Sequence, residues 1–371
     1  MGTNAASPGS FLRRTAAALV VLVAAVAGVH ISGSSADPTP PLPLPALPGL
    51  PSVSPPVGAA PAEPGALFGA YVQGTGNDAA AQMTAVETRE RDLGRRLAID
   101  HHFYPWDKEF PTGREQADLR AGRIPMISWN GTLNLGIDLG LEDDLIKTRA
   151  DAVKALPGKV LIRWMWEMDG RRKADDSGHP ALYVAAWRHI HDVFAAEGAT
   201  NVQWVWCPNA TAFADDRNAP AYYPGDEYVD WIASDGYNWG VSKRDQGDRW
   251  RQVLEIFDEF MVFARQHGKP IMIGEYGAQE QTQDPEAKPK WMRMAHDTFM
   301  DKPRTADCPW CGAYSDVAAV VYFDVNYGPH GDWRIMSSQE SLEAYKEAAV
   351  DPYFHQLETI SWPPSANRAT P

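Results

Sequence analysis

The chain has 371 residues with a formal net charge of −14 at pH 7, and 44% of its residues are hydrophobic. This acidic balance argues against a nucleic-acid partner, because proteins that bind nucleic acid carry basic faces. Once the N-terminal segments described below are set aside, about 300 residues remain, which suffices for one barrel-sized domain.

The first segment of the chain has the composition of an export signal. Ala16–Val29 is an unbroken apolar run that follows Arg13 and Arg14, and a basic start before such a run is typical of a secretory signal. We predict a signal peptide over residues 1–36. A membrane span needs about 20 apolar residues, and this run is shorter. Flanking residues could extend it, so an uncleaved membrane anchor is the alternative.

A proline-rich segment follows the predicted signal. Asp37–Gly65 contains 11 of the 30 prolines, and such stretches form extended spacers rather than folded domains. We therefore predict a linker over residues 37–65, one folded domain over 66–363 and a disordered tail over 364–371. A secreted protein, or one tethered to the outer face of the cell envelope, is expected, with no membrane contact beyond an N-terminal anchor.

Short apolar segments recur along the domain and alternate with helical patterns. Continuous apolar runs are typical of strands that are buried on both faces, and eight of them close a barrel. We predict a (β/α)8 TIM barrel of the α/β class, with an open doubly wound sheet as the alternative. The predicted strands are Leu67–Gln73, Leu97–Tyr104, Ile124–Trp129, Val160–Trp166, Val202–Trp206, Tyr228–Ser234, Pro270–Gly274 and Val317–Phe323.

Two of these strands end at a glutamate. Glu167 follows Val160–Trp166, and Glu275 follows Pro270–Gly274. In a barrel of this kind, catalytic groups lie at the carboxyl ends of the strands. Cleavage of a glycosidic bond needs two carboxyl groups, one protonated and one ionised. A pair on the fourth and seventh strands, which face each other across the barrel mouth, therefore predicts a glycosidase site.

Several segments together resemble glycoside hydrolase family 26. They are residues 161–170, 201–209, 223–226, 230–238, 269–277, 320–324 and 332–334, in the order and spacing of the family. The resemblance implies a retaining (β/α)8 hydrolase with Glu167 as general acid/base and Glu275 as nucleophile. It also implies that Tyr237 hydrogen-bonds the nucleophile, and that the substrate is a β-mannan or, for some members, a mixed-linkage β-glucan or β-1,3-xylan.

Other residues are expected to support the site. Family 26 belongs to a large clan of retaining (β/α)8 hydrolases that places a buried arginine near its carboxylates, and Arg163 is similar to that arginine. A structural ion pair is the alternative role for it. Asn209 ends the segment that looks like the family's fifth strand, and we expect it to contact substrate. Trp166 stands where family members usually have histidine, and an indole offers one donor and no acceptor. This departure puts the choice of sugar in doubt.

Aromatic and histidine side chains near the strand ends are further candidates for substrate contact. Trp129 and Trp206 end two predicted strands and are the first choices for rings that stack on sugar, with Trp333 a third. A core position is the alternative for each ring. His101 and His102 end the second strand, where alternation points one of them inward. His102 is selected as a substrate contact, with a hydrogen-bonded structural histidine as the alternative.

The remaining expectations concern cysteines, cofactors and partners. Cys308 and Cys311 are predicted to form a local disulfide, with an unpaired or redox-active state as the alternative. No metal or organic cofactor is expected, and we expect a monomer whose partner is a polysaccharide. The protein is predicted to be a secreted retaining endo-β-glycosidase that hydrolyses a β-linked polysaccharide of the β-mannan or β-1,3/1,4-glucan type. The alternatives are an enzyme that trims or transglycosylates envelope or exopolysaccharide, and a glycan-binding protein without catalysis.

Overall fold

The computed structural model describes residues 65–76, 78–170, 179–240, 249–281, 283–328 and 331–355. The signal peptide, the linker except for Gly65, and the tail lie outside the described residues, so they stay predictions, as do export and anchoring. Among the residues described, no helix has both the length and the apolar character needed to cross a membrane.

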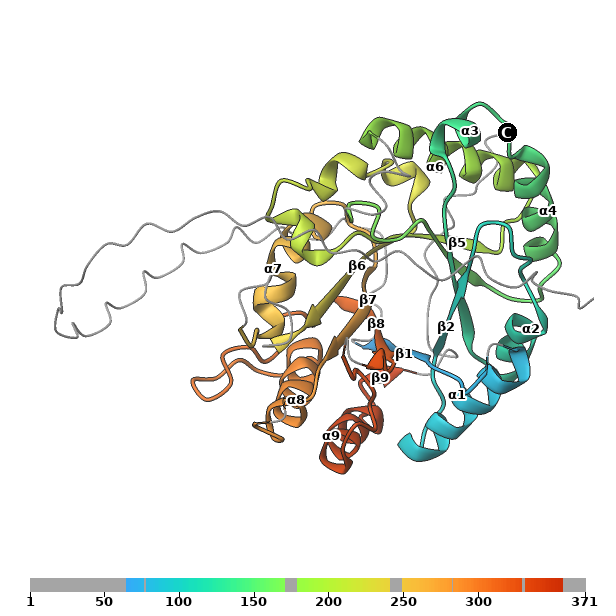
Figure 1. The fold of residues 1–371 in the computed structure, drawn as a ribbon. Coiled ribbons are helices and arrows are strands. Elements are labelled where there is room, and N and C mark those ends of the chain that lie inside the picture. The colour runs from blue at the N-terminus through green and yellow to red at the C-terminus, as the bar shows by residue number, and fades with distance from the viewer. Residues whose placement is uncertain are drawn as a thin grey trace, which may run out of the picture. The chain divides into compact units, whose positions relative to one another are not determined.

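Eight parallel strands close into a barrel at the centre of the domain (Figure 1). Neighbours pair in the order β2-β3-β4-β5-β6-β7-β8-β1, and β1 pairs with β2 to complete the ring. This confirms the predicted (β/α)8 fold. The strands are β1 (Ala66–Val72), β2 (Ile99–Tyr104), β3 (Ile124–Trp129), β4 (Val160–Trp164), β5 (Val202–Trp206), β6 (Trp231–Asn238), β7 (Ile271–Ala278) and β8 (Val317–Asp324).

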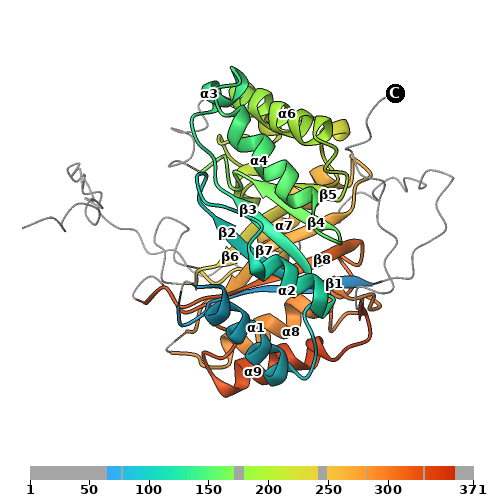
Figure 2. The same cartoon turned by 90° about the vertical axis from the view of Figure 1, so that its right-hand side faces the viewer.

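Helices surround the barrel, and Figure 2 shows α3, α4 and α6 together on one side of it. Two caps illustrate how the sequence sets their ends. The carboxylate of Asp78 accepts a hydrogen bond from the first turn of α1, and Thr112 forms a capping box with Glu115 at the start of α2. The helices are α1 (Ala79–Leu93), α2 (Gly113–Ala121), α3 (Asn134–Asp138), α4 (Asp143–Lys154), α6 (Pro180–Ala196), α7 (Val253–Ala264), α8 (Ala287–Phe299) and α9 (Gln339–Ala349).

Short elements complete the described part of the chain. A two-residue strand, β9 (Phe354–His355), pairs with the start of β1 and was not predicted. Three 3-10 helices lie between β5 and β6. They are η1 (Ala210–Phe213), η2 (Ala219–Tyr222) and η3 (Asp226–Tyr228).

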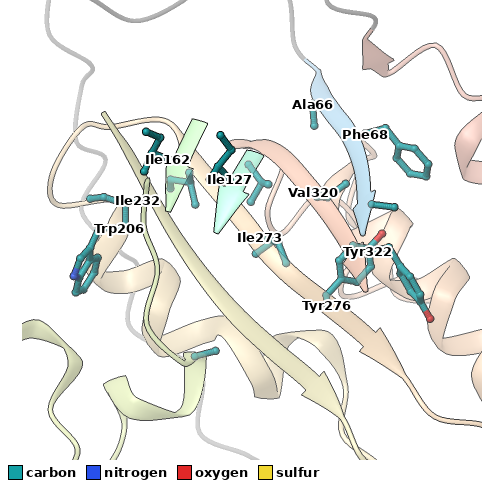
Figure 3. Packing of buried hydrophobic residues seen from close by; sticks show 14 of the residues in the cluster. Ala66, Phe68, Ile127, Ile162, Trp206, Ile232, Ile273, Tyr276, Val320 and Tyr322 are labelled. Carbon is teal, nitrogen blue, oxygen red and sulfur yellow. The ribbon is translucent and has the colours of Figure 1, made fainter. Parts of the chain in front are cut away.

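The barrel strands separate two hydrophobic cores, because side chains alternate between the faces of a strand. One core fills the barrel interior with residues such as Leu161, Val205 and Met272. The other lies between the barrel and its helices, and Figure 3 shows members of this outer layer from neighbouring strands, including Ile127, Ile162, Ile232, Ile273 and Val320. A residue's place in the alternation therefore decides whether it can reach the barrel mouth.

Three strand boundaries differ from the prediction in ways that affect the site. β4 ends at Trp164 instead of Trp166, because Met165 and Glu167 adopt left-handed backbone conformations. β6 begins at Trp231 and extends to Asn238, so Tyr237 lies within a strand. β7 continues to Ala278, and Glu275 is paired with Asp235 of β6. Glu275 therefore lies within a strand and is paired with β6, while the pairing of β7 with β8 is irregular between Ile273 and Tyr276.

His102 occupies a buried ion cluster behind the barrel wall, between β2 and α2. Its Nδ1 lies 2.9 Å from Glu115 Oε1, and its Nε2 lies 3.1 Å from Asp100 Oδ2 and 2.8 Å from Asp118 Oδ2. Burial and the charge of Arg114 would lower the pKa of His102. The charge and hydrogen bonds of the facing carboxylates outweigh both effects and raise this pKa to about 10. The imidazolium is therefore a structural cation.

Replacement of His102 should destabilise the fold in a pH-dependent way. We expect His102→Leu to lower the free energy of unfolding at pH 6 by about 3–5 kcal/mol, since it leaves buried carboxylates without their partner. A raised histidine pKa stabilises the fold fully below the unfolded value of 6.5, and this stabilisation is lost as pH rises toward about 10. The difference between wild type and variant should therefore shrink over that range in urea titrations.

The matched control for this prediction is His189→Leu. His189 pairs with Asp143 at 2.6 Å on the partly exposed side of α6, and pairs of this kind contribute about 1 kcal/mol or less. If both variants lost the same small amount of stability at every pH, the cluster around His102 would not be the structural element described above.

The cysteines behave as the sequence indicates. Cys308 and Cys311 form a disulfide in the segment between α8 and β8, which confirms the predicted bridge. Cys207 is free and buried in the barrel interior. Its Sγ lies 3.5 Å from Arg163 Nη1 and 3.1 Å from Asp235 Oδ1.

Candidate active site

Glu167 leaves the barrel on a strained turn after β4. Met165 has φ 44° and Glu167 has φ 52°, and a non-glycine residue in this region costs about 1–3 kcal/mol. The turn is fixed from the neighbouring strand, because the Glu167 N–H donates to the carbonyl of Cys207 at 2.7 Å. The half-buried Glu167 carboxyl is thus presented at the carboxyl end of the barrel.

Asn209 anchors the residues that follow Glu167. Its backbone N–H donates to Asp169 Oδ1 at 2.8 Å, and its side-chain amide donates to Asp169 Oδ2 at 3.1 Å. Asn209 was expected to contact substrate. In the structure its amide N–H₂ is directed to Asp169, so its role here is to hold the turn that carries Glu167.

Glu275 lies in the barrel mouth with both carboxylate oxygens bonded. Arg163 Nη2 donates to Oε1, and the Tyr237 hydroxyl donates to Oε2. The hydrogen bond from Tyr237 that the family resemblance implied is therefore present. Burial raises the pKa of Tyr237 well above its usual value, and the negative charges of Glu275, Asp235 and Glu167 raise it further. The phenol consequently stays a donor.

All five N–H groups of the Arg163 guanidinium are accepted by the protein. Nη1 donates to both oxygens of Asp235 at 2.8 Å, Nε donates to Ser128 Oγ at 2.7 Å, and Nη2 bonds His101 Nε2 at 3.1 Å as well as Glu275. Arg163 is fully buried. A guanidinium without a free donor cannot bind sugar hydroxyls. Arg163 instead lies beside the carboxylates, as the resemblance implied, and orients them.

A glycine makes room for this arrangement. A Cβ at Gly274 would lie 2.7 Å from Asp235 Oδ1 and 2.7 Å from Cys207 Sγ, and 3.3 Å from Arg163 Nη1. Cβ atoms essentially never lie as close as 2.7 Å to another heavy atom, so a side chain at this position would displace the ion pair. The residue before Glu275 therefore has to be glycine.

The two glutamates open onto the same part of the barrel mouth. Their strands, β4 and β7, are three places apart in the ring of eight. The negative charges of Glu275 and Glu167 both act on Tyr237, and both also contribute, after burial, to the raised pKa of Tyr327. Two carboxyl groups beside one opening form the pair that glycosidic cleavage needs.

Aromatic side chains cluster at the carboxyl ends of β1, β2, β4 and β8. The Trp166 ring is 5.1 Å from Phe103 and 5.4 Å from the Arg163 guanidinium carbon. Further contacts join the neighbouring rings at 4.9–5.9 Å between centroids. We call this set the aromatic wall; its members are Tyr71, Phe103, Trp166, Phe323 and Tyr327.

Comparison with known proteins assigns the family. The sequence model of Glycosyl hydrolase family 26 matches residues 144–299, a region that includes both glutamates. Endoglucanase H from Acetivibrio thermocellus is 32% identical over 275 residues. The chain belongs to glycosyl hydrolase family 26. The alignment with Endoglucanase H covers 71% of this chain but 29% of that protein, so the chain spans less than a third of its curated relative.

Solved structures of low sequence identity share the fold of this family 26 chain. A GH26 beta-mannanase from Bacteroides ovatus is 16% identical, with a TM-score of 0.54 over 80% of this chain and 91% of the other. A modular endo-beta-1,4-mannanase from Cellulomonas fimi is 14% identical, with a TM-score of 0.56 over 80% of this chain and 73% of the other.

In this family 26 member, Trp129 and Trp206 are not placed to contact sugar, contrary to the expectation. Trp129 and Trp206 have no exposed surface and lie in the outer core layer. Their indole N–H groups donate to the carbonyls of Trp106 and Tyr222, each at 3.1 Å. Both residues end a strand on the face that points away from the barrel interior, so neither ring can stack on a sugar.

Trp333 and His102 also differ from the expectation. Trp333 is 1% exposed and packs behind Tyr237, with 5.0 Å between ring centroids. It supports the nucleophile's partner and presents no face to solvent. His102 points away from the barrel interior, into the ion cluster between β2 and α2. His101 is the histidine that points inward, next to Arg163.

Sequence reasoning did not single out Tyr327 as a member of the site. Among the described residues, it is the one aromatic side chain among the large exposed hydrophobic ones, with 53% of its surface accessible. It follows β8 and lies 5.9 Å from the Phe323 ring. Its position beside both glutamates makes it a ring on which a sugar could stack.

Two groups of described side chains have atoms of the types that bind metals. Asp297, Cys308 and Cys311 form one group, but both sulfur atoms are in the disulfide and cannot act as thiolates. The other is Asp100, His102 and Asp118, whose carboxylates already pair with His102, Arg114 and Arg123. Neither group adjoins the two glutamates.

Proposed function

We propose that this family 26 chain hydrolyses β-linked polysaccharide by a retaining double displacement. The observation that carries the proposal is the carboxylate of Glu275, which accepts a hydrogen bond from a charged donor on one oxygen and from Tyr237 on the other. Both donors complement negative charge on a nucleophile. The half-buried Glu167, at the other side of the same opening, suits a group that has to exchange protons.

In the first step, Glu275 attacks the anomeric carbon and the bond to the leaving oxygen breaks, while Glu167 gives its proton to that oxygen. The sugar is then joined to Glu275 through an ester. In the second step, Glu167 takes a proton from water as the water attacks the same carbon, and Glu275 leaves as a carboxylate. Two displacements on one carbon return the original configuration.

We further propose that the polysaccharide is a β-glucan and that cleavage is internal. The relative that supports this is named an endoglucanase and is 32% identical to the chain. The aromatic wall adds support, because rings of this kind stack on the flat C–H faces of sugars whose hydroxyls are equatorial. A β-mannan is the second candidate, since the proteins of similar fold are named mannanases.

A panel of polysaccharides tests this function. The purified chain should lower the viscosity of lichenan or barley β-glucan faster than it releases reducing ends, and should act more weakly on mannan and xylan. A preference for mannan would overturn the choice of glucan but keep the hydrolase. If the folded protein cleaved no β-glycan of the panel, while a commercial glucanase did so under the same conditions, the proposed function would be wrong.

A further inference from the structure

Two buried polar side chains lie beneath Arg163 and have no part in the mechanism above. His101 of β2 and Ser128 of β3 have no exposed surface. Ser128 is the register partner of Arg163 on the adjacent strand β4. Three neighbouring strands thus bring one imidazole, one hydroxyl and one guanidinium together inside the barrel.

The hydrogen bonds in this group determine the protonation of His101. Arg163 has only donors, so the 3.1 Å contact from Nη2 to His101 Nε2 requires a lone pair on that nitrogen. Ser128 Oγ accepts from Arg163 Nε at 2.7 Å and lies 2.6 Å from the same histidine nitrogen. His101 is therefore neutral. Burial and then the charge of Arg163 hold the pKa of His101 well below its usual value.

These contacts fix the orientation of the Arg163 guanidinium. Asp235 binds Nη1, while His101 and Ser128 bind the Nη2 and Nε side. The second hydrogen on Nη2 is the one given to Glu275. Loss of the acceptor at His101 would leave a buried N–H of a charged group unsatisfied, which the guanidinium can relieve by rotating away from the nucleophile.

We propose that His101 and Ser128 are positioning residues that hold Arg163, and through it the Oε1 atom of Glu275, in line for attack. The inference rests on the proposed function. It implies a specific kinetic effect: both side chains are buried beneath the site, so their loss should lower kcat and leave KM nearly unchanged. It also implies that any neutral hydrogen-bond acceptor in the place of His101 Nε2 is sufficient to hold Arg163.

The test compares two replacements of His101. His101→Phe keeps a ring but removes the acceptor, and kcat on β-glucan should fall about 10–100-fold, as expected for a displaced catalytic group. His101→Gln carries an oxygen near the position of Nε2 and should recover most of that loss. Ser128→Ala removes the acceptor for Nε and should also lower kcat with little change in KM, which keeps the test decisive if His101→Phe does not fold.

The control is His296→Phe. His296 is another buried histidine, on α8, and bonds the Tyr276 hydroxyl at 3.3 Å on the outer side of the barrel. This variant should lose stability without a fall in kcat. The inference fails if His101→Gln is as impaired as His101→Phe, if the effects fall on KM, or if folded His101→Phe and Ser128→Ala keep wild-type kcat.

Crystal structures of the same variants separate this inference from the proposed function. In His101→Phe the guanidinium should have turned away from Glu275, and in His101→Gln it should keep the wild-type contact. This readout does not depend on turnover. An inactive wild type would overturn the proposed function, whereas an unmoved Arg163 in His101→Phe would overturn the positioning role.

Discussion

Glu275→Ala should lose turnover by more than the about 10²–10⁴-fold that general acid–base assistance contributes. The physical reason is that no other carboxylate in the described barrel mouth has both oxygens held by Arg163 and Tyr237. Without Glu275 the glycosyl ester cannot form, and the substrate meets only Glu167. Initial rates on β-glucan, and on an aryl β-glycoside with a good leaving group, measure the loss.

Azide should partly restore the activity of Glu275→Ala. A small anion fits the space of the missing carboxylate and attacks the anomeric carbon from that side, while Glu167 protonates the leaving oxygen. A single displacement inverts the carbon, so the product from a β-glycoside should be an α-glycosyl azide. Glu259→Ala, at an exposed position on α7, is the matched control and should act as the wild type. A Glu275→Ala enzyme with near wild-type rates would contradict the assignment.

Glu167→Ala should lose about 10²–10⁴-fold on polysaccharide and much less on a dinitrophenyl β-glycoside. The dinitrophenolate leaves without a proton, so the first step no longer needs Glu167. The second step still needs a base to deprotonate water, so the glycosyl ester should accumulate. A burst of dinitrophenol followed by a slow steady rate, recorded in a stopped-flow instrument, measures this behaviour.

The two variants serve as controls for each other. Azide added to Glu167→Ala should accept the sugar from the ester without a base, after two displacements, and give a β-glycosyl azide. The opposite configuration is expected from Glu275→Ala. If Glu167→Ala lost the same factor on both kinds of substrate, Glu167 would not be the group that protonates the leaving oxygen.

The barrel, and the position of both glutamates at its carboxyl end, could be predicted from the sequence because long apolar runs mark the strands. Glu167 and Glu275 follow apolar runs, and the closed parallel sheet brings such ends to one face. The exact backbone positions of the two glutamates could not be predicted in the same way. The left-handed turn at Met165 and Glu167 and the extension of β7 through Glu275 depend on neighbouring strands, which a single segment does not reveal.

The errors in the site follow from the phase of the alternation. Ser128 pairs in register with Arg163 and shares its inward face, so the next residue, Trp129, has to point outward. In the same way His102 pairs with Ile127 of the outer layer, which leaves His101 inside. The register between strands is set by their packing and was not available from the sequence.

One residue that reaches the site from a loop, Tyr327, carried no signal in the sequence. Tyr327 follows β8 in an irregular segment, where neither period of alternation applies. It is held there by the backbone hydrogen bond from its N–H to the carbonyl of Gly331 at 2.9 Å. Asn326, its neighbour, donates from its N–H to Gln73 Oε1 at 2.9 Å, a contact between the two ends of the domain. Such long-range contacts determine which ring lines the mouth.

The most direct test of the retaining mechanism is to trap the glycosyl ester. A 2-deoxy-2-fluoro-β-glucoside with a dinitrophenyl leaving group forms the ester readily, and the fluorine slows its hydrolysis. After incubation and proteolysis, mass spectrometry should find one sugar attached to the peptide that contains Glu275, with loss of activity in proportion. A label on another residue, or inactivation without any covalent sugar while the wild type releases inverted product, would contradict the assignment of Glu275 as nucleophile.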